Sequence, residues 1–132
     1  MIVDTSAWLE YLRATDSPTD AAITRMVDEE ADLFVPELVV MELQVGSGDE
    51  RHARALGRLL RSLEVVPIAP IVDTERAASL QRQCRRAGRT VRNMVDCMIA
   101  AMAVRLGEPV LHRDRDFDVL AAHTELEVVS LG

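Results

Sequence analysis

Residues 93–104 read NMVDCMIAAMAV, and this stretch decides how the chain folds. After Asn93, every position is apolar or weakly polar except Asp96. A helix that is apolar on all sides packs inside a domain rather than on its surface. We therefore predict a buried helix from Asn93 to Leu106, which Gly107 ends because glycine commonly follows the last helical turn. The single carboxylate in this helix needs a partner, because an unpaired buried charge is costly.

Short apolar runs alternate with helical patterns along the rest of the chain. Such runs are typical of buried strands. Strands that alternate with helices predict an α/β domain with a parallel sheet and helices on both faces. The predicted strands are MIVD (1–4), DLFVP (32–36), EVVPI (64–68), PVLH (109–112) and LEVVSL (126–131). The other predicted helices cover 5–12, 36–45, 49–62, 72–87 and 116–123, and one more begins at Pro18 after the cap residue Ser17.

The composition is typical of one globular domain. The chain has 132 residues, of which 48% are hydrophobic and 28% are charged. We predict a single domain over residues 1–132. No apolar run approaches the ~18 residues of a membrane span, and the N-terminus does not resemble a signal peptide. The expected location is therefore the cytoplasm.

Charge is unevenly distributed along the chain. The formal net charge of −7 argues against nonspecific nucleic-acid binding. Between Arg76 and Val95, however, there is no acidic residue, and every basic residue is arginine. Arginine suits phosphate oxygens, although a solvated helix face explains the same run. The arginines of this segment are Arg76, Arg82, Arg85, Arg86, Arg89 and Arg92.

Five acidic residues have unusual sequence surroundings. Glu42 has apolar or small neighbours three and four positions away on its predicted helix, and Asp96 lies in the buried helix. Asp4 and Asp114 follow apolar strands, and open parallel sheets bind ligands beyond the carboxyl ends of their strands. Asp116 comes shortly after Asp114. One shared site accounts for all five positions.

Each acid also has an ordinary explanation. Arg92 could pair with Asp96 across one helical turn. Asp4 could simply cap the first helix, and Asp116 and Asp118 could favour the start of the last one. These alternatives explain single residues, but they do not explain the whole set.

Carboxylates that share a pocket repel one another. Two unit charges ~4 Å apart interact by about 4 kcal/mol at an effective dielectric constant of 20. A divalent cation cancels this repulsion, and an all-oxygen site suits Mg²⁺ or Mn²⁺ rather than zinc. His52, His112 and His123 show no metal-binding spacing. His112 lies close to the predicted site in sequence, where it either contacts substrate or has a structural role.

With these motifs in view, the sequence resembles the PIN-domain ribonucleases, and among them the VapC-type toxins of bacterial toxin–antitoxin pairs. The matching segments are IVDTSAW (2–8), with Asp4, Thr5 and Ser6, then VPELVVMELQVG (35–46), VRNMVDCMIAAMAV (91–104) and VLHRDRDF (110–117). The resemblance implies a five-stranded parallel sheet in the order 3-2-1-4-5. It also implies an acidic quartet at positions 4, 42, 96 and 114, a further acid at 116, and support of the first acid by Ser6.

The resemblance further implies a Mg²⁺- or Mn²⁺-dependent endoribonuclease that binds one or two ions and uses a metal-activated water. Glu42 would bind metal directly or through water, or orient the attacking water. Arg89 and Arg92 would hold flanking phosphates of the RNA. One departure is His112, which stands where many members have Thr or Ser.

Protein partners are implied as well: an antitoxin that blocks the site, and a second copy of the chain in a homodimer. An apolar groove for the antitoxin would be lined by Trp8, Tyr11, Leu12, Ile23, Met26 and Val27, unless these are ordinary core residues. The alternative function is a catalytically silent interaction module that keeps the PIN fold.

Overall fold

A computed structural model of the chain describes residues 1–131; residue 132, the end of the predicted domain, lies outside this range. The strands are β1 (Ile2–Val3), β2 (Phe34–Pro36), β3 (Glu64–Val66), β4 (Val110–Leu111) and β5 (Val128–Val129). The helices are α1 (Thr5–Leu12), α2 (Pro18–Asp28), α3 (Glu37–Val45), α4 (Glu50–Arg61), α5 (Val72–Arg86), α6 (Met94–Leu106) and α7 (Arg115–His123). Every predicted element is present, and the strands are shorter than predicted because most lead directly into helix caps or turns.

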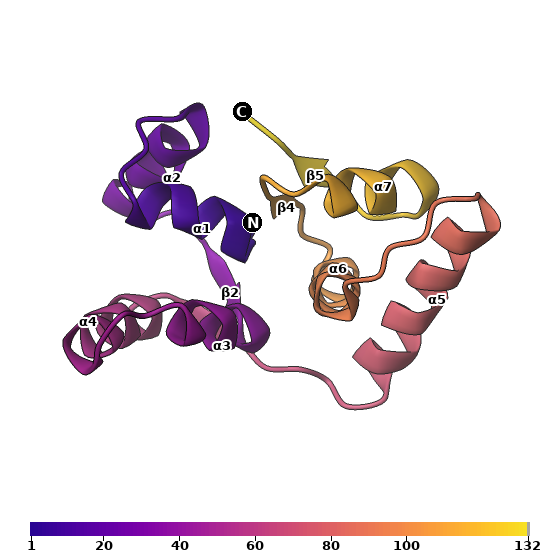
Figure 1. Cartoon of the computed structure of the whole chain (residues 1–132), viewed down its shortest axis with the longest axis horizontal. Helices are drawn as coiled ribbons and strands as arrows, with labels where there is room; N and C mark the ends of the chain where they lie inside the picture. Colours follow the sequence, from indigo (N-terminus) through magenta and orange to yellow (C-terminus); the bar gives the residue numbers. More distant parts are fainter. Residues whose placement is uncertain (132) are drawn as a thin grey trace.

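The sheet is parallel throughout, with the strand order β3-β2-β1-β4-β5. This confirms the order 3-2-1-4-5. Right-handed crossovers place the helices that follow β1 and β2 on one face, and those that follow β3 and β4 on the other. In Figure 1, α1–α4 accordingly gather on one side and α5–α7 on the other.

Helix starts follow from local side-chain chemistry. Ser17 accepts a hydrogen bond from the Asp20 N–H at 3.1 Å and so caps α2, whose first residue is Pro18. Asn93 caps α6 through the N–H groups of residues 95 and 96. Gly107, with a positive φ of 68°, ends α6 in the left-handed conformation that glycine adopts without strain. The predicted start of α2 and the predicted end of α6 are therefore confirmed.

The core lies between the sheet and its helices, and α6 contributes most to it. Residues Ile99 to Ala103 on α6 are fully buried. Trp8 and Phe117, the two largest fully buried side chains, come from opposite faces of the sheet. Among residues 1–131, no helix is both long enough and apolar enough to cross a bilayer. The predicted burial is confirmed for residues 96, 97 and 99–103, whereas Asn93 and Met94 at the start of the stretch are exposed.

Candidate metal centre

Two neighbouring strands bring acids from opposite ends of the sequence together. β1 pairs with β4, with Ile2 opposite Val110 and Val3 opposite Leu111. Asp4 follows β1 directly, and its backbone N–H donates to the carbonyl of Leu111 at 3.0 Å. The loop after β4 leads to Asp114 at the same edge of the sheet. The sheet topology therefore explains why residues 4 and 114 meet.

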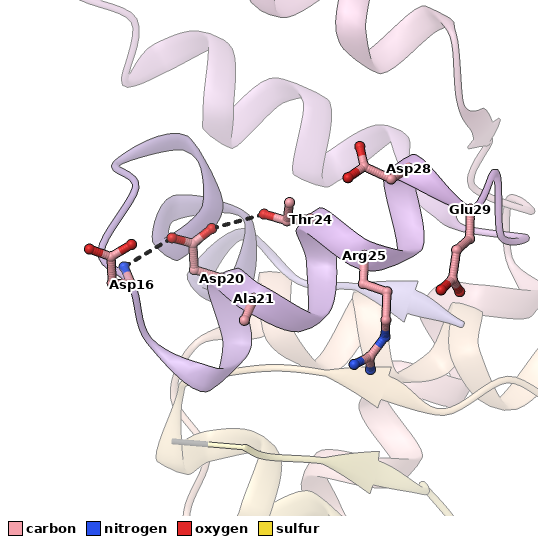
Figure 2. A pocket seen from close by; sticks show the side chains of 7 residues that line it. All are labelled: Asp16, Asp20, Ala21, Thr24, Arg25, Asp28 and Glu29. Atoms are coloured by element: carbon pink, nitrogen blue, oxygen red, sulfur yellow. Dashed lines mark hydrogen bonds between the residues drawn. The ribbon is translucent and has the colours of Figure 1, made fainter.

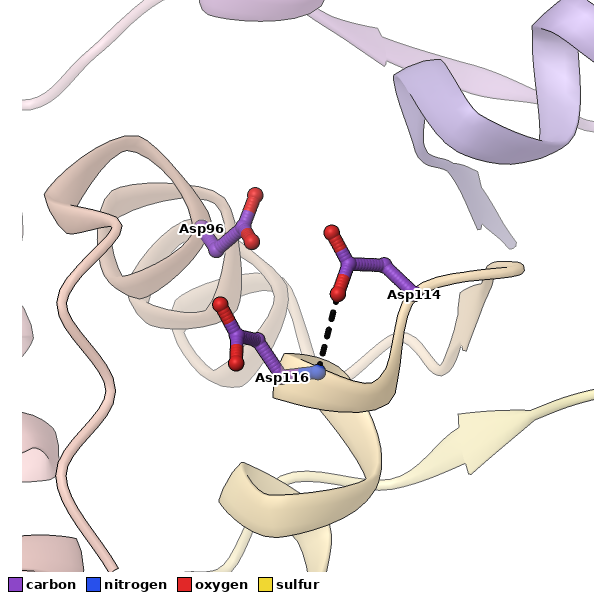
Figure 3. A group of neighbouring side chains, drawn as sticks. All are labelled: Asp96, Asp114 and Asp116. Carbon is purple, nitrogen blue, oxygen red and sulfur yellow. Dashed lines mark hydrogen bonds between the residues drawn. The ribbon is translucent and has the colours of Figure 1, made fainter.

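Three carboxylates from α6 and α7 form the centre of the cluster. Asp96, Asp114 and Asp116 each offer an oxygen atom, and these atoms lie within 4.8 Å of one another. Figure 3 shows Asp96 pointing from α6 toward the other two across the gap to α7. Asp114 caps α7 by accepting the Asp116 N–H at 2.9 Å. This cap explains how two residues of one helix start face the same point.

Asp4 has one occupied oxygen and one free oxygen. Its Oδ2 atom caps α1, accepting the Ser6 N–H at 3.0 Å and the Ser6 hydroxyl at 2.6 Å. The same hydroxyl accepts the Arg113 N–H at 2.9 Å and so joins α1 to the loop after β4. The Oδ1 atom is buried without a hydrogen-bond partner. Asp4 is thus both a helix cap and an available metal ligand.

Glu42 reaches the site from α3 through a contact that the sequence did not predict. The Thr5 hydroxyl donates a hydrogen bond of 2.8 Å to Glu42 Oε1. Burial raises the pKa of Glu42, the Thr5 hydrogen bond opposes this, and the negative charges of Asp4 and Asp114 raise it further. Glu42 therefore shares the electrostatic environment of the cluster, and Thr5 fixes one of its oxygens.

Among the acids of the cluster, Asp96 has the most strongly raised pKa. Burial raises the pKa of this carboxyl to about 8, and the charges of Asp4, Asp114, Asp116 and Glu42 add to the effect. The pKa of Asp4 is also raised, mainly by burial, although its hydrogen bonds to Ser6 lower it. Burial and mutual repulsion both disfavour the charged carboxylates, and a divalent cation would offset both effects.

Arg92 does not supply that cation, so the proposed pair with Asp96 is wrong. Oδ2 of Asp96 is buried without a hydrogen-bond partner, and Arg92 forms no ion pair with any residue in 1–131. The reason is the start of α6: Asn93 is the cap, so Arg92 lies before the helix and the spacing rule for one helical turn does not apply.

His112 has a structural position beneath the cluster. Its side chain is 1% exposed and packs against Phe117 with the ring centroids 5.3 Å apart. Nδ1 accepts the Asp114 N–H at 3.0 Å. Nε2 lies 3.3 Å from Asp118 Oδ1, at an angle that makes no hydrogen bond. A neutral ring with its proton on Nε2 fits this arrangement, and it orients the loop that carries Asp114.

The predicted antitoxin groove needs correction. Trp8 and Ile23 are completely buried, so they belong to the core, whereas Tyr11, Leu12, Met26 and Val27 are partly exposed. A separate apolar hollow of about 640 Å³ lies between α1, α3 and α4. Leu12 lines it together with apolar residues that the sequence pattern did not single out, Leu9, Leu43, Ala55, Leu56 and Leu59. The amphipathic pattern of residues 50–61 is the signal that could have found it.

Two further hollows differ in charge. Along α2, an acidic hollow of about 560 Å³ includes Asp16, Asp20, Asp28 and Glu29 (Figure 2). Both oxygens of Asp20 are occupied there, by the Asp16 N–H at 3.0 Å and the Thr24 hydroxyl at 3.3 Å. The second hollow contains Arg89 and adjoins Asp116; Arg92 does not line it.

The residues present fit a divalent cation. Three carboxylates converge, and buried oxygens of Asp4 and Asp96 lack any protein partner. Carboxylate oxygens are the ligands that Mg²⁺ and Mn²⁺ prefer. Asp4, Asp96, Asp114 and Asp116 are therefore the residues suited to hold such an ion, with Glu42 beside them.

Comparison with known families agrees with this fold. The sequence profile of the PIN domain matches residues 1–123, so the chain belongs to the PIN-domain family. Ribonuclease VapC11 of Mycobacterium tuberculosis and VapC ribonuclease Mb1587 of Mycobacterium bovis are each 41% identical to it over 131 residues, which is 98% of both chains. This similarity places the chain among the VapC ribonucleases of that family.

Solved structures show the same fold. The VapBC2 complex of Rickettsia felis bound to promoter DNA contains a chain that superposes with a TM-score of 0.78 at 14% identity, covering 99% of this chain and 98% of that one. At this identity the likeness concerns the fold alone.

Proposed function

We propose that the chain is a Mg²⁺- or Mn²⁺-dependent endoribonuclease and the growth-inhibiting toxin of a type II toxin–antitoxin system, acting in the cytoplasm as one domain over residues 1–132. The observation that carries the proposal is the set of converging carboxylates whose buried oxygens have no protein partner. The relatives named VapC ribonuclease support the reaction class.

Asp4, Asp96, Asp114 and Asp116 hold one or two ions in this proposal. Ser6 holds Oδ2 of Asp4 through its 2.6 Å hydrogen bond, and Oδ1 has no protein partner. When bound, the cation supplies the charge that acidifies a water nucleophile and offsets the charge that develops on the phosphate.

Glu42 acts at the edge of the cluster. Because Thr5 occupies its Oε1 atom, Oε2 is the oxygen available to a metal ligand or to the attacking water. A raised pKa suits a group that accepts a proton from water near neutral pH. Arg89 and Arg92 are exposed on the segment before α6, where they can neutralise phosphates that flank the cut.

The apolar hollow between α1, α3 and α4 is the proposed antitoxin surface. Thr5 and Glu42 line it together with the leucines, so the hollow reaches the acidic cluster. An antitoxin segment with an apolar face would bury this surface and cover the site in one interaction. Homodimerisation remains part of the proposal.

The test is cleavage of total bacterial RNA by the purified chain with Mg²⁺ or Mn²⁺, and with EDTA. We expect EDTA to abolish cleavage and Asp96→Asn to reduce it by at least about a hundredfold, because metal charge contributes several kcal/mol to such reactions. The control is Asp28→Asn, which changes an exposed acid of the α2 hollow and should cleave normally. RNA left intact by the folded wild-type chain would instead favour the catalytically silent interaction module.

A further inference from the structure

A hollow with two arginines adjoins the acidic cluster. It lies between the segment that follows α5 and the outer side of α7, and its volume is about 450 Å³. Its polar lining consists of Arg89, Thr90, Arg115, Asp116, Asp118 and His123. We call it the arginine hollow. Because Asp116 belongs both to this hollow and to the cluster, a ligand in the hollow would lie next to the reacting group.

The two arginines differ from others in the chain. Arg76, Arg105 and Arg113 each form an ion pair with a carboxylate. Arg89 and Arg115 are exposed and form no ion pair with any residue in the described range. Their guanidinium groups are therefore free to bind an anion, and a planar guanidinium matches the oxygens of a phosphate.

The net charge of the hollow depends on the neighbouring cluster. Asp116 and Asp118 offset the two arginines. A cation held by Asp116 neutralises one of these acids and leaves the hollow positive. Binding of an anion there is consequently strongest when the cluster is occupied by metal, which couples the hollow to the site.

The hollow on the other side of the acidic cluster is largely apolar. The hollow that contains Glu42 is lined mainly by apolar side chains. A polyanion has little to bind on that side, apart from Arg13 and His52 at its rim. The two sides therefore favour one direction for a nucleic-acid strand that leaves the cluster.

We infer that the arginine hollow binds one backbone phosphate of the RNA, adjacent to the phosphate that is cut, through Arg89 and Arg115. This inference rests on the proposed ribonuclease function. It adds Arg115 to the residues that contact substrate and distinguishes Arg89 from Arg92, which lies outside the hollow.

The experiment measures KM and kcat for a synthetic RNA that spans one site cut by the wild-type chain, at several salt concentrations. The variants are Arg89→Gln, Arg115→Gln and the double substitution, and the matched control is Arg86→Gln. Arg86 is an exposed arginine of α5 outside the hollow and has no ion pair in residues 1–131.

We expect KM to rise about tenfold for each single variant, with kcat nearly unchanged. In the double variant, the negative slope of log affinity against log salt should become less steep by about 0.7, the value for one phosphate contact on a single strand. Arg115→Lys should keep the salt slope and lose part of the affinity, because lysine keeps the charge without the planar fork. The increase in Tm on adding Mg²⁺ should be the same in all variants.

The two possible failures are distinguishable. If the wild-type chain cleaves no RNA, the proposed function fails and the phosphate site fails with it. If the wild-type chain cleaves RNA and the double variant matches Arg86→Gln in KM and salt slope, only the phosphate site is refuted. A loss confined to kcat would refute it as well, because a site that only holds a flanking phosphate acts on binding.

Discussion

Helix α6 carries a charged residue near each end, Asp96 in its first turn and Arg105 in its last, and their charges are neutralised differently. Arg105 donates to both oxygens of Asp73, at 2.9 and 3.0 Å, and Asp73 is 0% exposed. The Ala69 N–H adds a third hydrogen bond of 2.7 Å. Asp96 is 4% exposed and has a buried oxygen without any partner.

Asp73 and Asp96 show two different roles of a buried acid. Asp73 is balanced within the chain and joins α5 to α6. Asp96 is surrounded by other acids and can be balanced only from outside the chain. Burial alone therefore does not mark a functional carboxylate; burial with an unoccupied oxygen does.

The largest expected effect comes from breaking the balanced pair. Arg105→Ala leaves Asp73 buried without its cation, which should lower the free energy of unfolding by about 3 kcal/mol. Urea unfolding measures this loss. Arg86→Ala, at an exposed arginine without an ion pair, should change stability by less than about 0.5 kcal/mol. Equal stabilities of the two variants would show that the Asp73 pair is not structural.

Adding a divalent cation should give the next largest effect. At a Mg²⁺ concentration of one hundred times Kd, the wild-type chain should gain about 2.7 kcal/mol of stability. Calorimetric Tm measurements with and without EDTA test this. Asp96→Asn should lose most of the gain, while Arg105→Ala and Asp28→Asn should keep it. An unchanged Tm in the wild-type chain would argue against a metal site.

The pH dependence of stability in the metal-free chain tests the role of Asp96. A carboxyl whose pKa is about 8 when folded binds its proton more tightly in the folded than in the unfolded state. Stability should therefore fall as pH rises from about 4 to about 8. Asp96→Asn removes this titration and should be more stable than wild type at pH 8, because the wild-type carboxyl loses there the proton that favours the folded state.

Unfolding curves in EDTA at pH 5 and pH 8 provide the measurement. The advantage of Asp96→Asn should be largest at pH 8. If the two chains lose stability equally over this range, Asp96 is not the titrating group.

The smallest effect concerns His112, which positions the cluster through a neutral hydrogen bond. His112→Ala removes the side-chain acceptor for the Asp114 N–H and should weaken Mg²⁺ binding about tenfold, as is typical for residues that orient metal ligands. His112→Thr provides a hydroxyl acceptor and should recover most of the affinity. Titration calorimetry compares them, and equal affinities would exclude a positioning role.

Much of the fold could be predicted because its signals are local. Apolar runs, helix caps and the glycine at 107 fixed the order of elements, and the strand ends at residues 4 and 114 indicated where acids would meet. Contacts between distant residues could not be predicted in this way. Thr5 and Glu42 are 37 positions apart, and only the packing of α1 against α3 brings them together.

Two expectations failed for different physical reasons. An apolar stripe on α1 and α2 shows that these helices bury a face, but it does not show what covers that face. Trp8 and Ile23 face the core, whereas the open apolar hollow uses leucines of α1, α3 and α4. The Arg92–Asp96 pair failed because one residue lies outside the helix.

The two carboxylate oxygens of Asp4 have different roles, which amino-acid substitutions can separate. Its Oδ2 atom caps α1, and its other oxygen is buried without a protein partner. Asparagine caps helices as well as aspartate does, whereas alanine does not. A folding screen at position 4 would thus accept residues that an activity screen rejects. Loss of the proposed ribonuclease activity through Asp4→Asn is therefore a single step that need not pass through an unfolded protein.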